Sequence, residues 1–247
     1  MLFSIVIPAH NEEKYIGGCL EAVLKARDYS KIPAEQVQMI VVCNRCTDNT
    51  EKIARELGAE ICINDDKCIA AVRNAGAARA RGKILVTIDA DSKMSETSLA
   101  EIYKMLRSGE YIGGGTISMF DRWSLGIAVS AMYVGAKAAP FMIKHKAPLM
   151  CGMFWCLKRS FDKIGGFDET LVSLEDMDFA VRLKKLGEKR GKKYGVLKRS
   201  KIITSSRKFD EFGDWYLIKN RKLTKAIFTG KDREAADKFY YDLRNEK

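Results

Sequence analysis

The stretch Lys83-Ile-Leu-Val-Thr-Ile-Asp89-Ala-Asp91-Ser92 determines how the rest of the chain can be interpreted. Ile84 to Ile88 are a short, nearly continuous apolar run, which predicts a strand buried on both faces of a parallel sheet. Asp89 and Asp91 follow where this strand leaves the sheet, at the edge where open α/β sheets bind ligands. Because residues i and i+2 of an extended strand share a face, we expect both carboxylates to point the same way.

Two carboxylates on one face indicate a metal site. Hard oxygen donors suit Mg²⁺ or Mn²⁺, which such sites share with the phosphates of a ligand. The alternative is that Asp91-Ser92 only caps a helix that begins near Met94. An Asp-x-Asp motif alone does not separate the two interpretations, so the surrounding segments carry the argument.

The segments before Asp91 alternate between strand and helix patterns. We expect strands at residues 3–8, 37–42, 59–63 and 84–88 and helices at residues 15–26, 50–57 and 70–80. This alternation predicts an α/β protein with a parallel sheet and helices on both faces. After Asp91 the rhythm changes. We expect helices at 95–106, 125–143, 158–164 and 173–186, strands at 111–120, 149–157 and 198–204, and a mostly helical tail from 205.

Length and composition restrict the class of protein. A chain of 247 residues with 47% hydrophobic content suits one domain or two tightly fused halves. Seven cysteines, and an N-terminus without the basic lead of a signal peptide, predict reduced thiols in the cytosol. The apolar segment 125–143 contains Lys137 and Pro140, which favours a buried or interfacial helix over a membrane span.

The net charge of +11 is concentrated in one segment. Residues 182–208 hold twelve Lys or Arg and one acid, so this segment accounts for the whole excess. A solvated face explains such a run, and the functional alternatives are an anionic membrane surface, a phosphorylated acceptor or nucleic acid. The chain has no zinc-finger spacing and no ribonucleoprotein aromatic pattern, which argues against nucleic acid as a partner.

Six segments, in order and spacing, resemble the motifs of glycosyltransferase family 2, whose members have the GT-A fold and use nucleotide-diphosphate sugars. The matching segments are Ile5-Val-Ile-Pro8-Ala-His-Asn11-Glu12, residues 41–50, Arg73-Asn74-Ala-Gly76, Asp89-Ala-Asp91, Gly165-Gly-Phe-Asp-Glu169 and Glu175-Asp176-Met-Asp178. The resemblance implies a Rossmann-like, mostly parallel sheet abutting a smaller acceptor-binding half. It implies a single domain over 1–247, with a nucleotide-sugar half (1–92), an acceptor half (93–204) and a helical tail (205–247).

The resemblance also implies roles for residues near the first strands. Pro8, Ala9 and Glu12 would line the nucleoside pocket, Asn44 would hold the base, and Arg73 would contact the nucleotide or its diphosphate. For Glu12 a simpler explanation is equally good, since an acid at a helix N-terminus is favoured by the helix dipole.

The turn after the second strand departs from the family pattern. Cys43-Asn44-Arg45-Cys46 stands where the family commonly has Asp-Asp-Gly-Ser, so the base that Asn44 prefers is open. The C-x-x-C spacing could also belong to a zinc half-site or a redox pair. The chain contains no second C-x-x-C, which argues against zinc.

The acidic residues receive metal and catalytic roles by resemblance. Asp91 would bind Mg²⁺ or Mn²⁺ directly, and Asp89 would hold the ribose or assist the metal. Asp176 would be the general base of an inverting transfer, and Glu175 would orient or bind the acceptor. The alternative is structural, because Ser173-x-x-Asp176 resembles a helix capping box.

The function expected from these residues is metal-dependent sugar transfer from a nucleotide diphosphate to a hydroxyl of a glycan, lipid or small molecule. Some relatives supply a C-terminal histidine to the metal, but the only histidines here are His10 and His145. We expect Arg207 or Lys208 to close over the diphosphate instead. We also expect a cytoplasmic protein, with a peripheral position at a membrane as one alternative. The alternative is a non-catalytic nucleotide-sugar or glycan-binding protein of the same fold.

Overall fold

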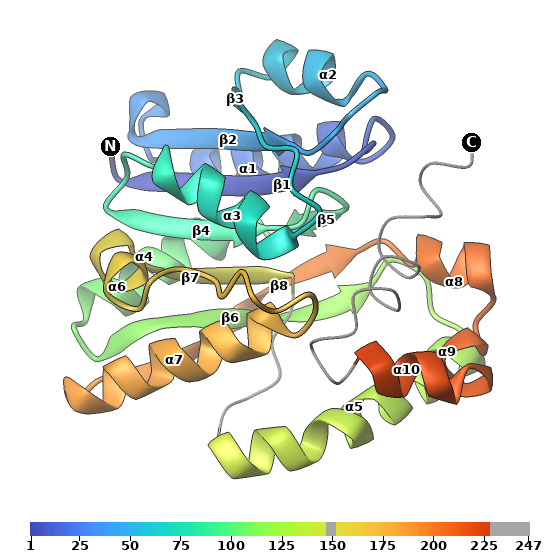
Figure 1. Cartoon of the computed structure of the whole chain (residues 1–247). Coiled ribbons are helices and arrows are strands. Elements are labelled where there is room, and N and C mark those ends of the chain that lie inside the picture. Colours follow the sequence, from blue (N-terminus) through green and yellow to red (C-terminus); the bar gives the residue numbers. More distant parts are fainter. Residues whose placement is uncertain (147–151, 228–247) are drawn as a thin grey trace.

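Eight strands form one continuous sheet in the computed structural model, which describes residues 1–146 and 152–227 (Figure 1). The strands are β1 (Phe3–Ala9), β2 (Val37–Cys43), β3 (Glu60–Ile63), β4 (Ile84–Ile88), β5 (Ser92–Met94), β6 (Tyr111–Phe120), β7 (Met153–Leu157) and β8 (Lys193–Thr204). Their order across the sheet is β3-β2-β1-β4-β7-β6-β8-β5. The mostly parallel α/β fold expected from the sequence is confirmed.

The two halves of the chain meet inside this sheet. Strands β3, β2, β1 and β4 are parallel, and β7 then pairs antiparallel with β4, from Ile84 opposite Leu157 to Ile88 opposite Met153. Beyond β7, β6 is antiparallel to β7 and parallel to β8, and β5 closes the edge antiparallel to β8. Backbone hydrogen bonds across β4 and β7 therefore hold the second half against the first.

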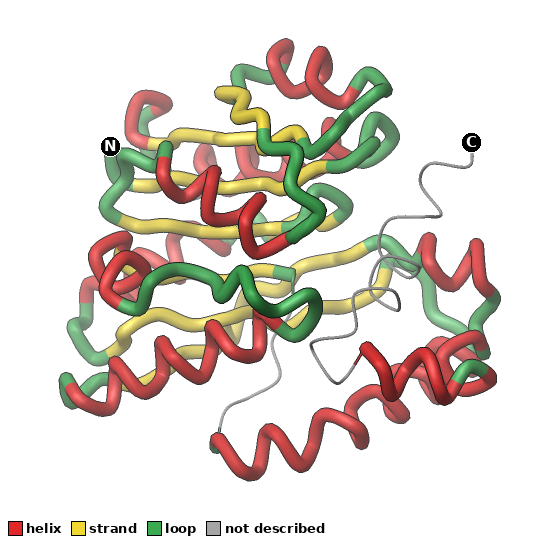
Figure 2. The backbone as a smooth tube through the Cα atoms, viewed as in Figure 1, coloured by secondary structure: helices red, strands yellow, loops and turns green. Residues whose placement is uncertain are grey.

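Helices cover both faces of the sheet, as Figure 2 shows. One face carries α1 (Ile16–Tyr29), α2 (Thr50–Glu56) and α4 (Ser98–Arg107), and the other carries α3 (Ile69–Ala78), α6 (Lys158–Lys163) and α7 (Glu175–Lys189). Successive strand residues point to opposite faces. Thus Ile5 and Val86 belong to the first core, whereas Val6 and Leu85 belong to the second. This two-sided burial explains the continuous apolar runs of β1 and β4.

A group of four helices, α5 (Leu125–His145) and the last three described helices of the chain, lies beside the sheet (Figure 1). The last three are α8 (Arg207–Phe212), α9 (Tyr216–Lys219) and α10 (Arg221–Ile227); a short 3₁₀ turn (Ala34–Gln36) precedes β2. Ser124 caps α5 by accepting a hydrogen bond from the Ile127 amide, 3.1 Å away. The Ser130 hydroxyl donates to the carbonyl of Asp214 at 2.6 Å, which ties α5 to the segment before α9.

Two capping interpretations of the sequence are wrong. Ser92 does not cap a helix but begins β5, whose Ser92 and Met94 are buried where it pairs with β8, and α4 begins later, at Ser98. Helix α7 begins at Glu175 behind Leu174, which has a left-handed backbone, so Ser173 is not its N-cap. Of the strand expected over 149–157, residues 153–157 form β7, and residues 149–151 lie outside the described part.

Candidate functional site

Three segments with motif residues end at the same edge of the sheet. Ala9 is the last residue of β1, Asn44 follows β2 directly, and Asp89 follows β4 directly. Because these strands are parallel and adjacent, their carboxyl ends meet. Pro8 and Ala9 are themselves buried in the end of β1, beside Val42 and Cys43 of β2.

Asp89 and Asp91 occupy a tight turn rather than a strand. The Ser92 amide donates to the Asp89 carbonyl at 3.0 Å, and the Asp89 amide donates to the carbonyl of Gly152 at 3.0 Å. Both carboxylates nevertheless line the same cavity. The turn, and not the two-residue repeat of a strand, brings both residues to this cavity; a shared direction of their carboxylates stays a prediction.

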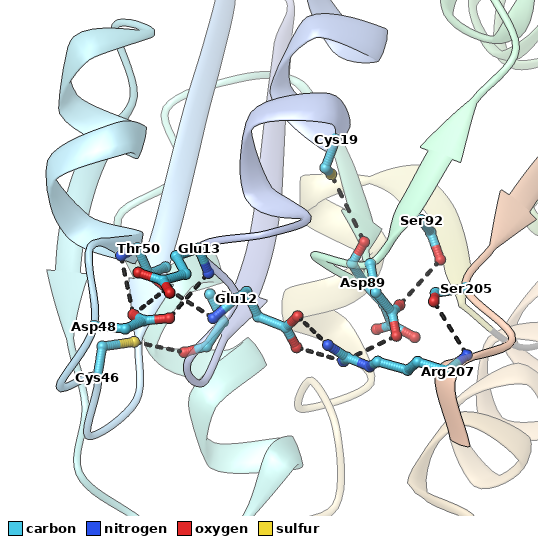
Figure 3. A network of polar contacts seen from close by, with 12 residues as sticks. Glu12, Glu13, Cys19, Cys46, Asp48, Thr50, Asp89, Ser92, Ser205 and Arg207 are labelled. Carbon is cyan, nitrogen blue, oxygen red and sulfur yellow. Dashed lines mark hydrogen bonds and ion pairs between the residues drawn. The ribbon is translucent and has the colours of Figure 1, made fainter. Parts of the chain in front are cut away.

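Arg207 joins Asp91 to Glu12 (Figure 3). Its guanidinium binds the Glu12 carboxylate with two hydrogen bonds, at 2.5 and 2.7 Å, and lies 3.0 Å from Oδ2 of Asp91. The guanidinium also lies over the Tyr15 ring, 4.7 Å from its centroid. The Glu12 carboxylate thus binds Arg207 and does not lie in the first turn of α1, which has no acidic residue.

The loop that carries Glu12 is fixed by the turn after β2. The Glu12 amide donates to the Thr50 hydroxyl at 2.7 Å, and the Glu13 amide donates to Oδ2 of Asp48 at 3.0 Å. Asp48 also accepts a hydrogen bond from the Thr50 amide at 3.0 Å. Figure 3 shows these contacts behind Glu12, on the side away from Arg207. They position the Glu12 carboxylate toward Asp91.

The electrostatics around Asp91 suit a divalent cation. Burial raises the pKa of Asp91 above its ordinary value, and the charges of Asp89 and Glu12 add to this, while Arg207 acts in the opposite direction. Carboxylate oxygens are ligands that Mg²⁺ and Mn²⁺ accept. Within the described residues no group of three or more His, Cys, Asp or Glu could hold a metal. Asp89 and Asp91 could supply two of the oxygen ligands of such a cation.

Arg73 links the metal motif to the acidic start of α7. Its side chain is buried, and it donates to Oδ1 of Asp89 at 2.8 Å and to Oε1 of Glu175 at 2.6 Å. The Phe167 ring lies beneath it, with the guanidinium carbon 5.2 Å from the ring centroid. Arg73 therefore contacts two carboxylates, so any contact with a diphosphate would be additional to these.

The next residue of the same motif, Asn74, holds the Gly-Gly-Phe-Asp-Glu turn. Asn74 donates to the Phe167 carbonyl at 2.9 Å and accepts from the Phe167 amide at 2.9 Å. It also donates to Oε1 of Glu169 at 2.8 Å. These bonds dock the turn that precedes α7 onto α3, which brings Glu175 and Asp176 to the edge of the parallel sheet.

The carboxyl group of Asp176 has a raised pKa. Burial raises its pKa to about 7, and the neighbouring Glu175 carboxylate acts in the same direction, against the charge of Arg73. One oxygen accepts a hydrogen bond from the Met177 amide at 2.7 Å. A carboxylate with a pKa near neutrality can hold a proton that it removes from a hydroxyl.

Sequence and structure comparisons agree with this geometry. A family model described as glycosyl transferase family 2 matches residues 4–165, more than half of the chain. The chain belongs to glycosyl transferase family 2. Minor teichoic acid biosynthesis protein GgaA of Bacillus subtilis is 24% identical over 227 residues, which cover 84% of this chain and 48% of that protein. The low-salt glycan biosynthesis hexosyltransferase Agl6 of Haloferax volcanii is 34% identical over 107 residues, covering 43% of this chain and 25% of that protein.

Solved structures share the fold of this family 2 chain. The S. aureus TarS 1–349 structure in complex with UDP-GlcNAc has a TM-score of 0.64 at 16% identity, covering 99% of this chain and 72% of that one. The mannosyltransferase PcManGT from Pyrobaculum calidifontis, in complex with GDP-Man and Mn²⁺, has a TM-score of 0.61 at 15% identity, covering 97% and 70%. The chain spans less than half the length of the curated relatives it matches.

Asn44 is engaged within this family 2 chain. Its side-chain nitrogen donates to the carbonyls of Asn64 at 2.7 Å and Asp66 at 2.9 Å, and its oxygen accepts from Arg45 at 3.3 Å. The buried side chain fixes the loop after β3, so a direct bond from its amide group to a base would require one of these contacts to open.

The C-x-x-C pair lies at the same edge of the sheet. Cys43 and Cys46 are free thiols, and a hydrogen bond between them lowers the pKa of Cys46 and raises that of Cys43. Cys46 also lies 3.4 Å from the Ala9 carbonyl. Among the residues that the structure describes, no cluster of metal-binding side chains includes them, so the zinc interpretation gains no support.

Sequence reasoning missed a cavity of about 510 Å³ beside Asp89 and Asp91. Its wall is mainly apolar and comes from β6, α5 and the C-terminal helices. Lys208 also lines the cavity. The apolar and aromatic lining residues are Ile117, Met119, Phe120, Val134, Phe209, Phe212, Tyr216 and Leu217. The spacing of Phe209, Phe212 and Tyr216 is helical and was the available signal. Without the fold it could not be assigned to a ligand site.

Proposed function

We propose that this family 2 glycosyltransferase moves a sugar from a nucleotide diphosphate to an acceptor hydroxyl, with a divalent metal and with inversion at the transferred carbon. The observation that carries the proposal is Arg73, whose single buried guanidinium binds both Asp89 and Glu175. The metal motif and the acidic helix start therefore belong to one site, as a concerted transfer requires.

Asp91 and Asp89 are the residues proposed to hold Mg²⁺ or Mn²⁺. When bound there, the cation supplies Lewis-acid stabilisation to the phosphates of the leaving group. The chain's own contribution is to hold both carboxylates in one turn and to fix Asp89 through Arg73. Mn²⁺ in the PcManGT structure supports this assignment by likeness of fold.

Asp176 is the proposed general base. In an inverting transfer the acceptor hydroxyl loses its proton as it attacks from the face opposite the diphosphate, and a carboxylate within hydrogen-bond reach is the simplest acceptor of that proton. Its pKa of about 7 places Asp176 near the optimum for this role at neutral pH. Glu175, held by Arg73 at 2.6 Å, is proposed to orient the acceptor.

Arg207 and Lys208 supply positive charge on the other side of the metal motif. Arg207 pairs with Glu12 and Asp91, and Lys208 lines the cavity. We propose that they stabilise the diphosphate, with Pro8, Ala9 and Glu12 on the nucleoside side. We further propose a cytoplasmic protein that associates peripherally with an anionic membrane surface, supported by the basic segment 182–208.

Two measurements on the purified chain test the proposal. The first is the melting temperature with UDP, GDP, CDP and dTDP sugars, with Mn²⁺ or with EDTA; a ligand at 100 times its Kd adds about 2.7 kcal/mol to the free energy of unfolding. The second is nucleotide-sugar turnover with and without acceptor. We expect metal-dependent stabilisation and turnover. Stabilisation without turnover across acceptors would instead indicate a binding protein.

A further inference from the structure

Helix α5 has two apolar sides, and only one of them packs on the protein. Leu125, Met132 and Ile143 are 76%, 73% and 76% exposed. They are spaced by seven and eleven residues, which places them within about 20° of one another around the helix. The exposed Ala136 and Pro140 lie close to the same direction. These five residues form an exposed apolar stripe along the helix.

The opposite side of α5 forms a wall of the cavity. Ser130, Ala131, Val134 and Gly135 line it, and they lie roughly 80 to 180° from the stripe around the helix. In the described part of the chain, α5 is the one helix long and apolar enough to cross a membrane, by length and composition only. Because its inner side packs toward α9, as in the bond from Ser130 to the Asp214 carbonyl, a place along a membrane surface suits it better than a span.

The cavity connects this helix to the proposed chemistry. Asp89 and Asp91 form one part of its lining, and the other described lining residues all come from position 116 onward, on the acceptor side and tail. A molecule that reaches these carboxylates through the cavity passes side chains such as Phe120, Phe209 and Leu217. An apolar wall favours a hydrocarbon group over a hydrated sugar chain.

Charged groups indicate the orientation of such a molecule. Lys208 lines the cavity together with the two carboxylates, so the polar end of the ligand belongs there. On the outside of α5, the exposed Lys137 and Lys144 both lie about 100 to 120° from Leu125, beside the apolar stripe. Lysines in this position can reach anionic headgroups while their stems contact lipid.

We propose that the acceptor is a membrane-resident amphiphile whose hydrocarbon chain occupies this cavity and whose polar, hydroxyl-bearing head lies at Lys208, at the end of the cavity that Asp89 and Asp91 line. The apolar stripe of α5 rests on the bilayer from which the acceptor is taken. This inference rests on the proposed transferase function and names the class of its acceptor. Each methylene moved from water into apolar surroundings tightens binding about fourfold, so the chain and not the head dominates the affinity.

The test uses decyl phosphate, below its micellar concentration, as a soluble probe of the cavity, with inorganic phosphate as the comparison. Calorimetric titration of the full chain is expected to give a Kd for decyl phosphate at least about 100-fold lower than for inorganic phosphate. Equal affinities within about threefold would overturn the proposal, because the cavity would then recognise only an anion.

Two substitutions on α5 separate the cavity from the stripe. Gly135→Leu adds a side chain to the cavity wall at a position where a Cβ meets no atom within 4 Å, so the helix can accept it. We expect it to weaken decyl phosphate binding by about tenfold or more. The matched control Met132→Glu changes an exposed residue of the same helix outside the cavity lining and is expected to leave that binding unchanged. The reverse pattern would overturn the proposal, since the probe would then bind the outer surface.

Vesicle sedimentation tests the apolar stripe, and here the two substitutions are expected to exchange their effects. With phosphatidylcholine vesicles containing about one third phosphatidylglycerol, Met132→Glu is expected to reduce the bound fraction several-fold, whereas Gly135→Leu is not. Two results would overturn the proposal that the stripe of α5 rests on an anionic bilayer. One is that the unaltered chain binds purely neutral vesicles at low salt as well as it binds the anionic ones. The other is that Met132→Glu binds the anionic vesicles as well as the unaltered chain does. Nucleotide-sugar stabilisation is measured on the same preparations. Its absence would count against the transferase function, and its presence with no probe binding would count against the acceptor class alone.

Discussion

Arg207 lies 3.0 Å from Oδ2 of Asp91, the carboxylate proposed to bind the metal, and also donates two hydrogen bonds to the Glu12 carboxylate. Arg207 brings a positive charge to the carboxylate that the proposed cation would also contact. Metal binding at Asp91 would therefore be coupled to the Arg207 contact. This coupling leads to the first two predictions.

Asp91→Ala is expected to abolish the effect of Mg²⁺ or Mn²⁺ on nucleotide-sugar affinity while leaving the fold intact. Burial and the neighbouring carboxylates already disfavour the ionised form of Asp91, and Arg207 keeps its two hydrogen bonds to Glu12, so we expect the variant to fold. Titrations with Mn²⁺ and with EDTA measure the effect, and Asp65→Ala, at an exposed position, is the control. Undiminished turnover of the unaltered chain in EDTA would exclude a catalytic metal.

Arg207→Ala is expected to lower the free energy of unfolding by about 2 to 4 kcal/mol, because it removes the guanidinium that binds the buried Glu12 carboxylate with two hydrogen bonds. Adding Glu12→Gln should restore part of this loss. The double variant should therefore lose less free energy of unfolding than the two single variants lose in total. Denaturant unfolding of the four chains measures the coupling. Arg199→Ala, at an exposed position of β8, should cost less than about 0.5 kcal/mol. Strict additivity would show that the pair is unimportant in solution.

Arg73→Ala is expected to destabilise the chain by about 3 to 5 kcal/mol, since it leaves Asp89 and Glu175 facing each other without a counter-charge. Arg73→Lys should recover only part of this, because an ammonium group cannot reproduce the fork that meets two carboxylates. Thermal unfolding measures both, at about 2 to 4 °C per kcal/mol for a chain of this size. Arg79→Ala, at the position just after the end of the same helix, is the control, and an equal loss there would refute a special role for Arg73.

Asp176→Asn is expected to lower kcat by a factor of about 10² to 10⁴ while retaining nucleotide-sugar binding. In the unaltered chain the base must be ionised, so kcat should fall as the pH drops through about 7, and this limb should be missing in the variant. Steady-state rates between pH 5 and 9 measure both effects. Asp178→Asn is the control, since Asp178 pairs with Arg182 at 2.6 Å on the same helix. Native turnover by Asp176→Asn would place the base elsewhere.

The same residue makes a prediction about stability. A carboxylate whose folded pKa is raised to about 7 favours folding while protonated, and this contribution is lost as the pH rises from about 4 through 7. At pH 8, Asp176→Asn should therefore melt at a higher temperature than the unaltered chain, with a free energy of unfolding that is larger by roughly 1 to 3 kcal/mol. At pH 4 the two chains should melt at similar temperatures. Scanning calorimetry at both pH values measures the difference. A variant less stable at pH 8 would show that the ionised carboxylate is well compensated.

Local signals in the sequence predicted the parallel half of the fold well. Ile84 to Ile88 form β4, buried along their whole length, and Asp89 follows it, because a strand buried on both faces needs apolar residues without interruption. Patterns that depend on distant partners were misassigned. Ser92 was a candidate cap, but the unpaired edge of β8 recruits it into β5, a pairing between segments more than a hundred residues apart.

The sequence by itself determined where the parallel strands lie along the chain, the position of Asp89 and Asp91 at the carboxyl end of one of them, and the family to which the chain belongs. These features follow from hydrophobic period and short motifs, which are local in the chain. Only the tertiary structure decided that Arg73 joins Asp89 to Glu175, that Arg207 reaches Glu12 across 195 positions, and that α5 and the C-terminal helices enclose a cavity. Such contacts arise when packed elements bring remote side chains together, and no spacing in the sequence encodes that distance.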